Sequence, residues 1–136
     1  MGAWGHQNFE NDSAMDFVGD FMESPAIDTI QQALLLVIEA GVEEEYIETD
    51  DASAALAAAE IVATAAGSAA QDAPEELDAA IKKAELIVDE KILKQARKAV
   101  KQVLKKSKLQ ELWAEAGEMD EWEQVQLGLL KRLGQI

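Results

Sequence analysis

Apolar residues return every three or four positions along most of this chain, which is the spacing of an α-helix with one buried side. Across residues 12–23 the carboxylates occupy one side of such a helix and the apolar side chains occupy the other. Residues 118–133 show the same division, with an apolar stripe that includes Trp122 and Leu129. Patterns typical of β-strands are nearly absent, so the sequence predicts an all-α fold.

Helix start and stop signals divide this pattern into a compact bundle of six or seven helices in a single domain, residues 1–136. Ser24 and Pro25 are typical of an N-cap followed by a proline at the first helical position. Ser107 and Gln110 have the spacing of a capping box. The expected helices cover about residues 12–23, 25–41, 49–67, a segment that opens at Pro74, 89–106, 107–117 and 118–133.

The third expected helix, residues 49–67, is different because alanines lie on nearly every side of it. Small side chains let neighbouring helices approach closely, so we expect this helix to lie at the centre of the bundle. We also expect an ordered leader before the first helix, because residues 1–10 carry two glycines together with Trp4 and Phe9.

Glu60 interrupts the apolar surface of that central helix and shares a narrow polar stripe with Ser53 and Thr64. A buried carboxylate must be paired, hydrogen-bonded or protonated. Glu60 is therefore either a perturbed acid in a pocket or a structural tie to the leader, where the Trp4 indole and the glycine amides are donors. We favour the structural tie.

Charge is divided unevenly along the 136 residues, whose net charge is −15. All 12 lysines and arginines stand at or beyond position 82, whereas 18 of the 27 acids precede it, so the first part carries −18 and the rest +3. Such a surface repels phosphate over most of its area, which disfavours nucleic acid as a partner. The apolar runs are much shorter than the roughly 20 residues of a membrane span, so we expect no membrane partner. The absence of cysteine is consistent with a reducing cytoplasm.

Three acids, Asp12, Asp16 and Asp20, lie on one face of the first expected helix, where converging carboxylates can bind a divalent cation. The competing interpretation is a solvated acidic face near a helix N-terminus, whose dipole favours negative charge. His6 is the only histidine, so any catalytic arrangement that needs an imidazole depends on it. No motif indicates a cofactor. The candidate polar site consists of Trp4, His6, Asp12, Asp16 and Glu60, and the sequence leaves open whether it holds a metal.

The fifth expected helix, residues 89–106, has an apolar side and an opposite basic side that contains no acid. The basic side consists of Lys91, Lys94, Arg97, Lys98, Lys101 and Lys105. It is either the solvated face of a bundle helix or a surface for an acidic partner, such as the acidic half of a second copy. The candidate partner-binding residues are Lys94, Lys98, Lys101 and Lys105.

Several segments carry a recognisable pattern of small and aromatic residues. In the leader and the first helix these are Gly2, Trp4, Gly5, Phe9, Asn11, Asp12, Ala14 and Asp16. The pattern continues through residues 54–60 and 107–113 to Trp122, and it resembles the bacterial family catalogued as domain of unknown function 4259. The resemblance implies a compact helical domain with no established activity, cofactor or catalytic residue. The lysine-rich segment 85–106 departs from the family's usual composition.

We therefore expect an acidic, cytoplasmic, non-enzymatic module that binds another protein or, weakly and in a salt-sensitive way, a second copy of itself. The nearest physical precedent is an immunity-type protein, whose acidic surface covers the basic active site of a toxin. The alternative is a carboxylate-based hydrolase that depends on a divalent metal and uses acids of the first and third helices.

Overall fold

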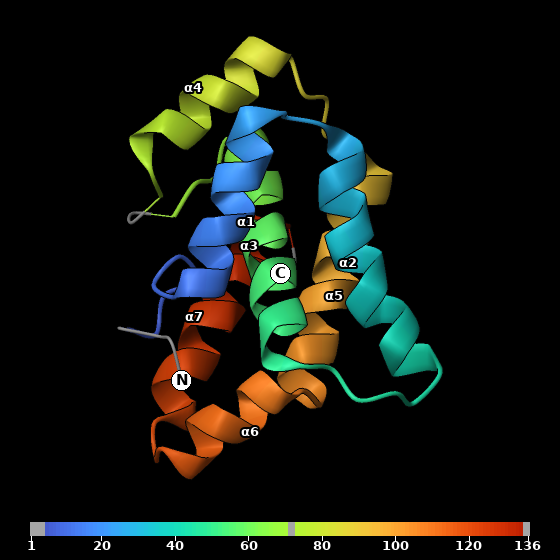
Figure 1. Ribbon diagram of the computed structural model, residues 1–136, viewed down its shortest axis with the longest axis vertical. Helices are drawn as coiled ribbons and strands as arrows, with labels where there is room; N and C mark the ends of the chain where they lie inside the picture. The colour runs from blue at the N-terminus through green and yellow to red at the C-terminus, as the bar shows by residue number, and fades with distance from the viewer. Residues whose placement is uncertain (1–4, 71–72, 135–136) are drawn as a thin grey trace.

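The computed structural model describes residues 5–70 and 73–134, which form seven α-helices and no β-strand (Figure 1). The helices are α1 (Asp12–Glu23), α2 (Ile27–Val42), α3 (Thr49–Ala65), α4 (Glu75–Ala84), α5 (Glu90–Lys105), α6 (Lys108–Glu115) and α7 (Met119–Arg132). The predicted all-α fold is confirmed.

Side-chain caps begin three of the helices. Asn11, before α1, accepts a hydrogen bond from the backbone N–H three residues later at 2.8 Å. Asp89 before α5 and Ser107 before α6 do the same at 3.0 and 3.1 Å. Each cap satisfies an N–H group that has no partner inside its helix. These three helices begin within one residue of the starts expected from the sequence, at about residues 12, 89 and 107.

The predicted start of α2 is wrong. The helix begins at Ile27 and not at Pro25, and no side chain caps it. Ser24 instead ends α1, and Ala26 has an extended backbone with φ −146° and ψ 139°. Both α1 and α2 pack against α3. We attribute the extended residues to this packing, because the chain has to cross from one side of α3 to another before α2 can begin.

The alanine-rich helix α3 lies at the centre of the fold, as its composition predicts. It contacts each of the other six helices, and its residues from Ala55 to Thr64 are all buried. Figure 1 shows α1, α2 and α5 gathered around it. Alanine side chains allow this close approach from several directions. The larger core side chains come from the surrounding helices, among them Phe21 of α1 and Trp122 of α7.

Candidate functional site

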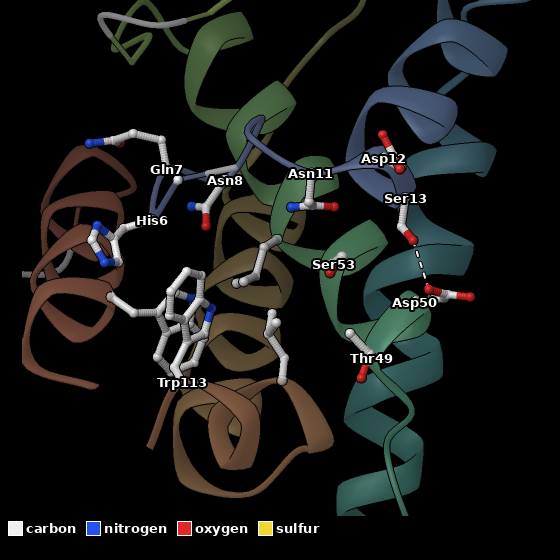
Figure 2. A pocket seen from close by; sticks show the side chains of 14 residues that line it. His6, Gln7, Asn8, Asn11, Asp12, Ser13, Thr49, Asp50, Ser53 and Trp113 are labelled. Atoms are coloured by element: carbon white, nitrogen blue, oxygen red, sulfur yellow. Dashed lines mark hydrogen bonds between the residues drawn. The ribbon is translucent and has the colours of Figure 1, made fainter. Parts of the chain in front are cut away.

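The described part of the leader, residues 5–10, covers a pocket of about 220 Å³. We call this cavity the leader pocket. Asn8 and Phe9 are buried at 3% and 4% exposure, which holds the leader on the bundle. The pocket walls come from the leader, the N-terminal ends of α1 and α3, and α6 and α7. Figure 2 shows His6 and Trp113 on one side of it and Ser13 and Asp50 on the other.

Two hydrogen bonds between exposed side chains help to join the elements that surround the leader pocket. The Ser13 hydroxyl donates to Asp50 Oδ1 at 2.7 Å and so links the first turns of α1 and α3. His6 Nε2 lies 2.9 Å from Glu118 Oε1, immediately before α7. The His6 ring also packs against Trp113, with ring centroids 4.9 Å apart and planes tilted by 43°. The imidazole is therefore positioned between a carboxylate and an aromatic wall.

The described lining of the leader pocket contains the carboxylates of Asp12 and Asp50 but no lysine or arginine. Ser53 lines the floor and is 2% exposed, and no hydrogen bond joins its hydroxyl to another described residue. Every fully enclosed side-chain nitrogen or oxygen in the described residues has a partner, so the Ser53 oxygen faces the cavity. These groups favour neutral or positively charged polar groups over anions.

Glu60 lies outside the lining of the leader pocket, in an adjoining buried network. Its carboxylate is 1% exposed and accepts two hydrogen bonds from the Arg132 guanidinium, at 2.7 and 3.0 Å. The Asn8 amide donates a third, at 2.8 Å. Asn8 and Gln126 also exchange a pair of hydrogen bonds, at 3.0 and 2.7 Å. The network joins the leader, α3 and α7, and it leaves no free Glu60 oxygen for chemistry.

The partners of Glu60 differ from those expected. Trp4, the proposed indole donor, lies outside the described residues, and the leader reaches Glu60 through Asn8. Sequence reasoning missed Arg132 and Gln126. A signal for Gln126 was available, since it stands four residues after Trp122 and three before Leu129, on the buried side of α7. A polar residue at such a position requires a buried partner.

The candidate metal-binding acids are not brought together. Asp12 borders the leader pocket and Asp16 does not, and both are exposed on α1. Across residues 5–70 and 73–134, no three histidine or acidic side chains are arranged to hold a metal ion.

A second region stands out along the chain from the last turn of α2 to the first turn of α3. Its exposed carboxylates, which we call the acidic strip, are Glu39, Glu43, Glu44, Glu45, Glu48, Asp50 and Asp51. Leu36 and Tyr46 are 49% and 53% exposed and border a hollow of about 210 Å³ within the strip. A hydrogen bond and the charge of neighbouring Glu43 raise the pKa of Glu45 above its ordinary value. The strip therefore concentrates negative charge around exposed apolar side chains.

Of the six residues on the basic side of α5, Lys91 and the four candidate partner-binding lysines are exposed, as expected. Lys94, Lys98, Lys101 and Lys105 are all exposed, and none forms an ion pair with another described residue. We call these four residues the basic face. Arg97 does not belong to it, contrary to the sequence prediction. Its guanidinium turns toward the end of α7, where it donates to the Leu133 carbonyl at 2.8 Å, and it also pairs with Glu90.

Comparisons with known proteins give a family but no activity. The model of the family described as Domain of unknown function (DUF4259) matches residues 2–125. The chain belongs to this family. Neither a curated protein nor a solved structure matches it. Among the described residues, no helix has the length and apolar character needed to cross a membrane.

Proposed function

We propose that this member of the DUF4259 family is a non-enzymatic module that binds a basic protein through its acidic strip, in the manner of an immunity protein that covers a basic toxin. The observation that carries the proposal is that seven carboxylates from Glu39 to Asp51 are all exposed. No lysine or arginine occurs before position 82, so no basic residue nearby in the sequence offsets this charge. We place the protein in the bacterial cytoplasm, which suits a chain without cysteine.

The strip combines charge with the side chains that anchor protein interfaces. Exposed Tyr46 and Leu36 stand among the carboxylates, and tyrosine is enriched among residues that dominate binding energy. A concentrated negative field speeds the encounter with a positively charged partner. Together these features support a basic protein as the ligand more strongly than a small molecule.

The metal-dependent hydrolase is the weaker candidate. It requires acids of α1 and α3 to converge on a cation. Asp12 and Asp50 both line the leader pocket, but Asp50 accepts a hydrogen bond from Ser13, and no third acid or histidine among the described residues completes a metal site with them. No observation on the described residues favours it over the binding module.

Capture on the immobilised protein, followed by calorimetry with each purified candidate partner, tests the proposal. A basic partner should bind with defined stoichiometry, and its affinity should fall steeply as salt rises. Glu39→Lys/Glu43→Lys should weaken binding by about tenfold or more, because both changes place repulsive charge in the strip.

The matched control is Glu75→Lys/Glu76→Lys, which makes the same change in net charge on α4. Figure 1 shows α4 at the opposite end of the molecule from the segment between α2 and α3. Equal weakening by both variants would mean that net charge alone attracts the partner and would contradict a defined site. Stoichiometric binding of magnesium, manganese, calcium or zinc that is lost in Asp12→Ala would favour the hydrolase instead.

A further inference from the structure

Part of the basic face lies next to part of the acidic strip, near the end of α2 and the end of α5. A groove of about 350 Å³ runs between α2 and α5, with Ile38 and Val42 on one side and three lysines of the basic face on the other. Val42 is 80% exposed, so the groove carries an apolar side chain that solvent reaches freely. Lys98, Lys101 and Lys105 are the three lysines that line it.

The two patches meet in a neighbouring hollow of about 400 Å³. Its lining includes Glu44 and Glu45 from the acidic strip, and Lys105 and Lys106 from the end of α5. Although these four side chains share one hollow, no ion pair within 4 Å joins them in the described part of the chain. Charges of both signs therefore stand side by side without neutralising each other.

We propose that this surface pairs with the same surface of a second copy about a two-fold axis. A two-fold contact places each patch of one copy against the other patch of its partner, so adjacent patches of opposite charge are complementary to themselves. Glu44 and Glu45 of each copy then face Lys98 and Lys101 of the other. The exposed Val42 side chains lie close to the axis, where they exclude water.

The arrangement of charges fits a second copy of this chain better than it fits another kind of protein. A second copy brings acids and lysines in the spacing that the two patches require, whereas a uniformly acidic or basic protein satisfies only one of them. The interface is small and rests on exposed charges, so the dimer is weak and salt-sensitive. The inference goes beyond the proposed function, because a dimer of this kind covers part of the acidic strip and competes with a basic partner.

Sedimentation equilibrium with charge-swapped variants tests the dimer. The natural chain should dimerise at low salt and dissociate at high salt. Lys98→Glu/Lys101→Glu and Glu44→Lys/Glu45→Lys should each weaken self-association by about tenfold or more, because every exchanged pair occurs twice in a two-fold interface. An equimolar mixture of the two variants should recover the dimer, since each variant then meets the opposite charges at both patches.

Lys82→Glu/Lys83→Glu is the control, because it makes the same change in net charge on exposed residues of α4 and should leave the dimer unchanged. Circular dichroism of all variants establishes that they remain folded. A natural chain that is monomeric at low salt, or a mixture that fails to recover association, overturns the proposal. Growth beyond a dimer with rising concentration also overturns it, because a closed two-fold contact leaves no surface for a third copy.

Discussion

The carboxylate of Glu60 stabilises the fold through a residue on another helix and a residue in the leader. The Arg132 guanidinium donates to both of its oxygens, and the Asn8 amide donates to one of them. Two-point contact with a guanidinium is among the strongest side-chain interactions, because both partners are charged and planar. These contacts fix how α7 and the leader pack on α3.

Replacing Glu60 by glutamine should lower the free energy of unfolding by about 1 to 3 kcal/mol, because a neutral amide offers only one acceptor to the guanidinium. Urea denaturation measures the change. The matched control is Glu90→Gln, which removes a carboxylate that also pairs with an arginine but is mostly exposed. Exposed pairs contribute about 1 kcal/mol or less, so the control should be close to neutral. Equal losses in both variants would contradict a special role for burial.

The pair Glu43 and Glu45 gives a prediction about titration. The hydrogen bond from one carboxyl to the other and their mutual repulsion raise the pKa of Glu45, because both favour its protonated form. A raised pKa in the folded state means that this pair opposes folding above that pKa and ceases to do so as pH falls. Glu43→Gln removes the repulsion, so the pKa of Glu45 should fall toward its ordinary value. A carbon-detected NMR titration measures it, and an unchanged value would contradict the coupling.

Single residues show where sequence reasoning succeeds and where it stops. Glu60 could be identified because a carboxylate on a helix buried on every side is anomalous in itself. Arg132 could not, because an arginine in the last turn of a helix is ordinarily exposed and favoured there by the helix dipole. Whether it reaches Glu60 depends on how α7 crosses α3, and local sequence does not specify that crossing.

At the scale of elements, the described leader packs as part of the core although it has no regular structure. Phe9 is 4% exposed, and its neighbour Asn8 belongs to the Glu60 network. Phe9→Ala should therefore lower the free energy of unfolding by about 3 to 5 kcal/mol, as for other buried phenylalanines. Gln7→Ala alters an exposed neighbour and should have little effect. An unchanged denaturation midpoint in Phe9→Ala would show that the leader is not part of the core.

Some helix boundaries are set by residues next to them in the sequence, and others are set by packing against distant helices. The starts of α1, α5 and α6 depend on a capping side chain and the three residues after it, so the sequence predicts them correctly. The start of α2 depends on where α1 ends relative to α3, which is a property of the assembled bundle. Pro25 is compatible with both a first helical turn and an extended connection, and packing selects the second.

For the whole molecule, the centre of the fold was more predictable than its surface. A helix composed largely of alanine has no single apolar face, so burial on all sides is its only stable placement in a bundle. The sequence also predicts which side of α5 carries the exposed lysines. The proximity of this side to the acidic strip was not predictable, because residues 39–51 and 94–105 come together only through the packing of α2 on α5.

The uneven distribution of charge also predicts how the stability of the fold changes when acidic residues at different helix ends are replaced by neutral ones. Glu39 lies in the last turn of α2 and Glu43 directly follows the helix, where the dipole is negative and no basic residue compensates. Glu39→Gln/Glu43→Gln should therefore raise the melting temperature, by about 3 °C, at low salt and at a protein concentration where the monomer predominates. The gain should shrink as salt rises, because it comes from screened interactions between exposed charges.

Asp120→Asn/Glu121→Gln makes the same change in net charge in the first turn of α7, where the dipole is positive and acids are favourable. This control should leave the melting temperature unchanged or lower it. If both pairs of substitutions raised the melting temperature equally, the total charge of −15 would be the cause, and the position of the acids would not matter. Opposite responses would locate the electrostatic strain at the end of α2, the region where we propose that basic partners bind and relieve it.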